Sequence, residues 1–213
     1  LDHIKIDIVT TDEQTIDITS LMVELSIFES IYSINLHGHL YLMDNVSLFS
    51  SLPILGQEKI VLEFDRLGTT VSKTFHITGV VDVKQNDSAA VYKLLFTSET
   101  KVKNNVSEFS RSFDGNSVQI MKEIYEEFFK PEEIEVLTYG SSSSKYVIPF
   151  MKPMQAINMI QMNASDTSFS PIFIFERLYK KAVITSLSEM TKADSIEKPS
   201  IKLNKNNETG QGL

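Results

Sequence analysis

The residues that could do chemistry in this sequence are few and poorly grouped. His37 and His39 lie two positions apart on an expected strand, so their side chains share a face and could hold a metal ion with Asp44 or a cross-strand ligand. No further ligand has the spacing of a complete site, and histidine pairs are common on solvated strand faces. We therefore predict no metal site and no cofactor.

Nucleophile signatures are equally weak. Ser142 and Lys145 match the Ser-x-x-Lys motif of acyl-transfer enzymes by letter, but that motif needs its serine at a helix start, and here a serine-rich loop leads into a strand. The common nucleophile, phosphate and zinc motifs are missing, and so is cysteine. A glycosidase needs only two facing carboxylates, so the 28 acidic residues leave this class of enzyme open. The lack of tryptophan disfavours it, because sugar-binding sites favour aromatic faces. We predict a structural or interaction protein, not an enzyme.

The composition fits a folded, water-exposed protein. Of 213 residues, 42% are hydrophobic and 23% charged, and no apolar run approaches the roughly 20 residues that span a bilayer. The first residues have neither the basic region nor the apolar core of a signal peptide, and the lack of cysteine suits a reducing cytosol. We expect no membrane insertion, and a protein that resides in a reducing cytosol or belongs to a body assembled in one.

The negative charge is concentrated in the first half. The net charge is −8, and residues 1–100 carry 14 acidic and 6 basic residues, whereas residues 101–213 carry 14 of each. An acidic surface repels nucleic acid, so this half is not expected to bind it. The alternative interpretation is an acidic surface that maintains solubility.

Residues 1–98 alternate apolar and polar side chains with the period of half-buried strands. The alternation covers residues 4–8, 21–27, 36–42, 60–64, 71–83 and 91–96. Hairpin turns are expected at residues 65–68 and 85–88, and a short helical turn from Asp44 to Phe49, closed by Pro53. Because each strand has one apolar face, we predict that the strands curl into an antiparallel β-barrel or a sandwich.

After residue 100 the apolar spacing becomes helical. We expect a helix over residues 117–129, capped by Asn116 or Ser117, and a second over 153–164 that starts at Pro153. A strand over 134–139, a serine loop over 140–144 and a hairpin of residues 173–175 and 182–187 complete this part. The polar composition of the segment from Glu189 on is typical of a linker or a frayed end.

The predicted fold class is therefore α+β. An N-terminal antiparallel β-barrel domain covers residues 1–100, and an α/β domain with two helices and a β-hairpin covers residues 101–190. Residues 191–213 form a polar tail or a linker.

The order and spacing of several segments resemble a known family. Residues 27–33 (Ile-Phe-Glu-Ser-Ile-Tyr-Ser), 36–44 and 52–60 (Leu-Pro-Ile-Leu-Gly-Gln-Glu-Lys-Ile) resemble the first tube domain of the central baseplate hub protein of contractile-tailed, T4-like phages. In the second half, Phe113-Asp114-Gly115, Ile148-Pro149 and the segments 173–176 and 183–187 are similar to motifs of the same family.

The resemblance implies a structural component of the virion tail. Hubs of this family are trimers in which each subunit supplies two barrel domains, so that three subunits mimic a six-fold ring. The ring would join the tail tube, or a tube-initiator protein, to a trimeric spike, and DNA would pass through it without specific binding. Spikes of secretion systems share this architecture and are the nearest alternative. A small-ligand-binding β-barrel protein is the other.

Two sets of residues are candidate sites under this interpretation. Acidic residues on the polar side of the strands are candidates to line the conduit, with outside solvent as the alternative: Glu24, Glu63 and Asp82. Apolar residues without an evident internal partner are candidates for the subunit interface, or for contact with a second barrel of the same chain: Met22, Met43, Leu52 and Ile54.

Overall fold

The first half of the chain forms one antiparallel sheet. The structure is a computed structural model, which describes residues 4–52, 54, 56–66, 69–86, 89–131, 133–141, 143–179 and 182–192. The strands of this sheet are β1 (Ile4–Val9), β2 (Thr15–Asp17), β3 (Met22–Phe28), β4 (His37–Asp44), β5 (Lys59–Arg66), β6 (Thr69–Gln85) and β7 (Ala90–Ser98). They are ordered β2-β1-β5-β6-β7-β4-β3, and every neighbouring pair is antiparallel.

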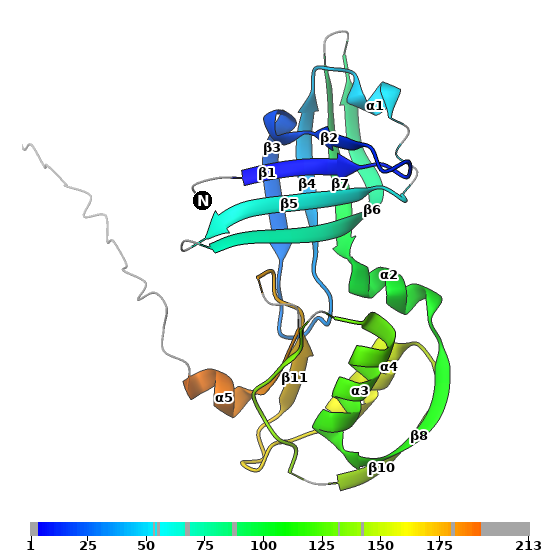
Figure 1. Cartoon of the computed structure of the whole chain (residues 1–213), viewed down its shortest axis with the longest axis vertical. Coiled ribbons are helices and arrows are strands. Elements are labelled where there is room, and N and C mark those ends of the chain that lie inside the picture. Colours follow the sequence, from blue (N-terminus) through cyan, green and yellow to red (C-terminus); the bar gives the residue numbers. More distant parts are fainter. Residues whose placement is uncertain are drawn as a thin grey trace, which may run out of the picture.

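The long strand β6 makes the sheet fold over on itself. Residues 69–76 of β6 pair with β5, whereas residues 75–85 pair with β7. The register shifts between Ile77 and Gly79 and again between Val81 and Lys84, and such bulges bend a strand. Figure 1 shows the result, since β1 and β5 cross in front of β3, β4 and β7. The sheet is therefore a curled half-barrel.

The two edges of this sheet are joined covalently and not by strand pairing. The short 3₁₀ helix η1 (Thr19–Leu21) connects edge strand β2 to edge strand β3, and the Ile18 N–H donates to the Ile6 carbonyl over 2.9 Å. Among the described residues no ladder links β2 to β3. The predicted antiparallel curled sheet is confirmed, but hydrogen-bonded closure into a barrel is not observed in this part of the chain.

The inner face of the half-barrel is a filled apolar core. The alternating residues of the strands are fully buried there, including Ile6, Leu40, Ile60, Leu94 and Phe75. This arrangement confirms the period-two interpretation of the sequence.

Gly38 lies on the same inner face, where β3 and the Phe96 ring come so close that only glycine fits. A Cβ atom at Gly38 would stand 2.2 Å from the Ser26 carbonyl oxygen and 2.6 Å from the Phe96 ring. No side chain fits there without a shift of the backbone of β3.

The expected helical turn lies further along the chain than predicted. The helix α1 spans Leu48–Ser51, and Asp44 is not its N-cap residue. The Asp44 carboxylate instead accepts hydrogen bonds from the N–H groups of Val46 and Leu48, at 3.1 and 2.9 Å. Asp44 thus shapes the loop that leads into the helix. The closing residue Pro53 lies outside the described residues.

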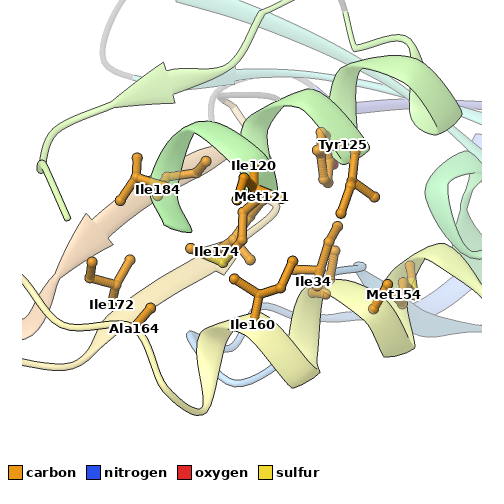
Figure 2. Packing of buried hydrophobic residues seen from close by; sticks show 14 of the residues in the cluster. Ile34, Ile120, Met121, Tyr125, Met154, Ile160, Ala164, Ile172, Ile174 and Ile184 are labelled. Carbon is orange, nitrogen blue, oxygen red and sulfur yellow. The ribbon is translucent and has the colours of Figure 1, made fainter. Parts of the chain in front are cut away.

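The second half combines helices with two small sheets. Its elements are α2 (Glu99–Val106), β8 (Phe109–Asn116), α3 (Ser117–Phe129), β9 (Glu135–Val136), β10 (Ser143–Met151), α4 (Pro153–Gln161), β11 (Ile172–Phe175), β12 (Val183–Ser186) and α5 (Leu187–Lys192). Strands β8 and β10 form a ribbon, and β12 pairs antiparallel with β11 and parallel with β9. Figure 2 shows that residues of α3, α4, β11 and β12 meet in one core, with Met121, Ile160 and Ile174 inside it.

The helix prediction is largely confirmed. Helix α3 covers the predicted residues 117–129, and the Asn116 side chain accepts from the Val118 N–H over 2.9 Å as its cap. Helix α4 starts at Pro153 but ends at Gln161, three residues before the predicted end. The hairpin of β11 and β12 is present, whereas the strand expected over residues 134–139 contains only the two residues of β9.

Other elements of this half were not predicted. Helix α2 contains the predicted domain boundary at residue 100, and helix α5, which begins at Leu187, extends into the segment from Glu189 on, where a polar tail was expected. The second half therefore has more than the two predicted helices. Residues 193–213 lie outside the described residues. In the part that the structure describes, no helix has the length and apolar character needed to cross a bilayer.

Candidate assembly surfaces

The two halves are joined by an exchange of apolar side chains. Ile34, from the loop between β3 and β4, is buried in the core of the second half (Figure 2). In return, Leu178, from the segment after β11, packs against the core of the half-barrel. The Leu178 N–H also donates to the Glu29 carboxylate over 3.0 Å. Each core therefore includes a residue from the other half of the sequence.

A buried ion pair lies at this junction. The Lys73 ammonium on β6 is 2.7 Å from the Glu176 carboxylate, and the two side chains are only 12% and 6% exposed. The second oxygen of Glu176 accepts from the Leu36 N–H over 3.4 Å. Because buried charges are tolerated only when they are paired, this contact fixes β6 against the segment after β11. No local pattern signals this pair, since Lys73 and Glu176 are 103 residues apart.

The three acidic residues proposed for the conduit all lie on the outer face of the half-barrel. Glu24 neighbours Tyr41 across β3 and β4, on the side away from buried Leu40, and Glu63 neighbours Lys5 across β5 and β1. Asp82 is exposed in the second bulge of β6, at a φ of 57°. The structure thus places the three acids on one face, and nothing in it shows what that face meets.

Each of these acids has a polar or charged neighbour. Hydrogen bonds from the Ser26 hydroxyl and then from His39 lower the pKa of Glu24, and the His39 ring nitrogen is 3.3 Å from its carboxylate. Asp82 is 3.4 Å from the Lys93 ammonium. On the outer face Glu24 and Asp82 therefore each lie next to a polar or basic side chain.

The acid Glu63 lies beside a second carboxylate on this face. The pKa of Lys5 is raised, first by its 2.6 Å hydrogen bond to Asp7 and also by the charge of Glu63. Lys5 therefore partly neutralises both acids.

The two histidines of β4 form an aromatic cluster. The Phe28 ring stacks on His37 with centroids 5.3 Å apart and lies 5.9 Å from the His39 ring. Among the described residues no group of three or more histidine, aspartate and glutamate side chains could hold a metal ion. Asp44, the alternative third ligand, is buried and bonded to the loop before α1.

The Ser-x-x-Lys match lies in a strand and not at a helix start. Lys145 belongs to β10 and faces Asp114 of β8 at 3.6 Å, while Ser142 is outside the described residues. This context agrees with the rejection of the acyl-transfer motif.

Three of the four apolar interface candidates have internal partners. Met22, Leu52 and Ile54 are partly buried against the core of the half-barrel. The expectation that they lack internal partners was wrong, because all three side chains pack against the core of the half-barrel. Only Met43, which is 52% exposed on β4, projects away from it. An interface role for these residues stays a prediction.

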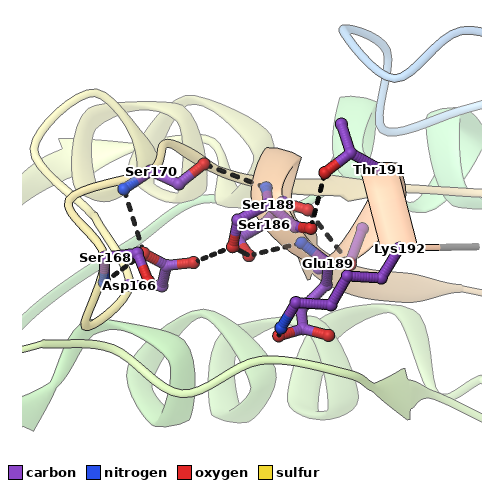
Figure 3. A network of polar contacts seen from close by, with 9 residues as sticks. Asp166, Ser168, Ser170, Ser186, Ser188, Glu189, Thr191 and Lys192 are labelled. Atoms are coloured by element: carbon purple, nitrogen blue, oxygen red, sulfur yellow. Dashed lines mark hydrogen bonds and ion pairs between the residues drawn. The ribbon is translucent and has the colours of Figure 1, made fainter.

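A turn at Asp166 organises the far end of the second half (Figure 3). The buried Asp166 carboxylate accepts from the N–H groups of Ser168 and Ser170, at 2.7 and 2.9 Å, and from the Ser188 hydroxyl at 2.6 Å. Hydrogen bonds from the Ser188 and Ser186 hydroxyls, followed by those from the backbone, hold the pKa of Asp166 far below its usual range. An Asp-x-Ser pattern is typical of a turn, and here that turn also anchors the start of α5.

The same turn exposes a large aromatic side chain. Phe169 has a φ of 60°, in the left-handed region that non-glycine residues seldom adopt, and it is 86% exposed. Its N–H donates to the Asp166 carbonyl over 3.0 Å. Tyr139 and Met162 are also strongly exposed in this half. No periodic pattern marks these residues, so the sequence did not identify them.

The comparisons with known proteins show the fold of the chain. No protein-family model and no curated protein matches the sequence. The 43 kDa tail protein of prophage MuSo2 from Shewanella oneidensis superposes with a TM-score of 0.59 and 12% identity, over 85% of this chain and 54% of that protein. A tail protein from Neisseria meningitidis MC58 gives a TM-score of 0.55 and 11% identity, over 85% and 50%.

The chain therefore has the fold of phage tail proteins, as the resemblance to baseplate hubs predicted. It spans about half the length of these two solved proteins. A Francisella PdpA–VgrG complex matches 92% of this chain and 30% of its own, at 13% identity and a TM-score of 0.48, which is too low to establish a shared fold.

Proposed function

We propose that this protein is a structural component of a phage tail, the central baseplate hub that joins the tail tube to a trimeric spike. The observation that carries the proposal is the fold, a curled antiparallel sheet followed by an α/β half, which superposes on two solved tail proteins. In this proposal the protein resides in the virion baseplate, is assembled in the host cytoplasm, and does no enzyme chemistry.

The proposed units are those expected from the sequence. The tube-like unit comprises residues 1–100, the α/β unit comprises residues 101–190, and residues 191–213 lead to further chain or end as a tail. Three copies form a ring, in which the half-barrel acts as the tail-tube-like barrel. Of the four apolar candidates, Met43 is the exposed one and is available to a neighbouring copy, while Met22, Leu52 and Ile54 pack against the core of the half-barrel.

The outer face of the half-barrel is proposed to line a DNA conduit. Glu24, Glu63 and Asp82 share this face, and three or six copies would bring them within one or two Debye lengths of about 8 Å. Such a wall repels the DNA backbone, so DNA passes without adhering.

Charge reversal in the assembled particle tests the conduit. A variant with Glu24→Lys, Glu63→Lys and Asp82→Lys is expected to fold, because exposed positions tolerate substitution, and to retain DNA in a salt-dependent way during ejection. If ejection is unchanged at low salt and no DNA is retained, these residues do not face the conduit.

A matched control separates position from net charge. Reversal of the exposed acids Glu108, Glu123 and Glu133 in the second half changes the total charge equally. Ejection by this control is expected to match the wild type.

Mass measurement of the full-length protein tests the ring. A trimer is expected at micromolar concentration, and a stable monomer there would contradict it. The alternative within the same architecture is a component of a secretion-system spike. A density map of the assembled particle distinguishes the two, because it shows whether the protein belongs to a phage tail or to a secretion system. The small-ligand barrel is disfavoured because inner-face residues such as Leu40 and Leu94 are packed against one another.

A further inference from the structure

A polar hollow of ≈ 330 Å³ opens beside the junction of the two halves. Its walls come from the loop between β3 and β4, from helix α2 and from the start of helix α4. Tyr32 of the loop, Lys101 and Asn104 of α2, and Lys152 and Gln155 at the start of α4 line it. None of these residues belongs to the surfaces assigned above.

Two amide side chains that line the hollow, those of Asn104 and Gln155, have hydrogen-bond donors to spare. The buried Asn104 side chain accepts from the Met154 N–H over 2.9 Å, which identifies the atom facing Met154 as its oxygen. Its NH₂ group has no acceptor among the described residues. Gln155 likewise uses its oxygen to accept from the Lys152 N–H over 3.3 Å. Because these two oxygens are engaged, the N–H donors of Asn104 and Gln155 remain for a ligand, whereas the Asn35 NH₂ already donates to the Leu36 carbonyl and the Thr97 hydroxyl.

The charges that line the hollow also favour a ligand that accepts hydrogen bonds. Lys101 and Lys152 are its charged lining residues, and no acidic residue lines it. Within the part of the chain that the structure describes, neither ammonium group forms an ion pair, whereas Lys73, Lys93 and Lys103 each do. Two free cations in a protein of net charge −8 make this hollow complementary to an anion.

We propose that the hollow binds carboxylate groups of an acidic segment of a partner protein. Carboxylates supply only acceptors, which match the remaining N–H donors and the two ammonium groups. Nucleic acid needs a continuous basic surface, and two lysines beside neutral amides do not provide one. Tyr32, which is 81% exposed and packs edge-on against Phe173, offers an aromatic contact at the rim. The proposal does not depend on the tail function.

A short peptide can test this site in the full chain. The probe is acetyl-Glu-Asp-Glu-amide, with acetyl-Gln-Asn-Gln-amide as the neutral control, titrated by calorimetry and by amide NMR signals. We expect saturable binding of the acidic peptide that weakens with added salt and shifts the Asn104 side-chain NH₂ and the Met154 N–H. The double variant Lys101→Gln and Lys152→Gln should weaken it by about tenfold or more.

Two further variants make the test specific to the hollow. Asn104→Asp keeps the oxygen that Met154 needs but replaces the NH₂ donors by a charged oxygen, so binding should be lost. Lys145→Gln removes an exposed lysine of β10 that does not line the hollow, and it should bind like the wild type.

The proposal is overturned if the wild type shows no saturable binding at millimolar peptide. Equal binding of the neutral peptide, or equal loss in Lys145→Gln and in the double lysine variant, also overturns it. A separate titration with inorganic phosphate distinguishes the sources of negative charge. Phosphate that shifts the same signals while the acidic peptide does not would assign the hollow to phosphate and refute the proposal.

Discussion

Replacing Glu176 by glutamine tests whether the junction holds the two halves together. The change keeps the size of the side chain and one oxygen acceptor, but it leaves the Lys73 ammonium without a counter-charge in a site where both side chains are largely buried. Removal of one partner of a buried pair costs about 3–5 kcal/mol. Because the glutamine oxygen still accepts one hydrogen bond, we expect a loss near the lower end, about 3 kcal/mol.

Urea denaturation and hydrogen exchange measure this loss and locate it. The midpoint of Glu176→Gln should fall, and exchange should accelerate first in β6 and in the segment after β11, where the pair lies. Lys73→Met should destabilise similarly because it leaves the carboxylate unpaired. The double variant should recover part of the loss, with a coupling energy of about 1–3 kcal/mol.

A surface pair provides the control for this experiment. Lys192 and Glu189 are 2.6 Å apart on α5, but their side chains are 68% and 35% exposed, so Glu189→Gln should change stability by less than about 0.5 kcal/mol. If Glu176→Gln has no greater effect than this control, water screens the Lys73 pair and the junction does not depend on it.

Two further predictions concern the backbone of the half-barrel and the Asp166 turn. Gly38→Ala should cost about 3 kcal/mol or more, because the new Cβ meets the Ser26 carbonyl, whereas Gly79→Ala, with no atom within 4 Å, should be tolerated; comparison of the two thermal midpoints checks this. The pKa of Asp166 is lowered in the folded protein, so its contribution is complete above the ordinary value of 3.8 and is lost as the pH falls through the lower folded pKa. Asp166→Asn should therefore lower stability at neutral pH and flatten its decline between about pH 5 and pH 2, and a parallel decline in both proteins would contradict this assignment.

The sequence predicted those elements whose apolar side chains repeat with a regular period. Strands of the half-barrel and helix α3 have one buried face each, and burial of that face decides their structure locally. Helix α2 escaped prediction because it is polar, and its buried residues are Thr100 and Asn104. Its position depends on contacts such as the one between Lys103 and the Phe129 carbonyl, which no local pattern reveals.

Counting charges along the sequence overstated the acidity available to a conduit. Glu29 accepts from the Leu178 N–H at the junction, Asp44 orders the loop before α1, and Glu58 accepts from the N–H groups of Gly56 and Gln57. These three carboxylates act inside the fold. Only residues such as Glu24 and Asp82, which are exposed on the outer face, can contribute to a field outside it.

The junction also bears on how such a chain could form a closed ring. A ring closes only if each copy presents its two contact surfaces at one fixed angle, since a variable angle produces open arrays. A hinge between the halves would allow that angle to vary. The exchange of Ile34 and Leu178 between the cores, together with the Lys73–Glu176 pair, opposes hinge motion because any opening exposes apolar surface and separates buried charges. The interlock therefore holds the two halves at one fixed angle, which is what the proposed ring requires.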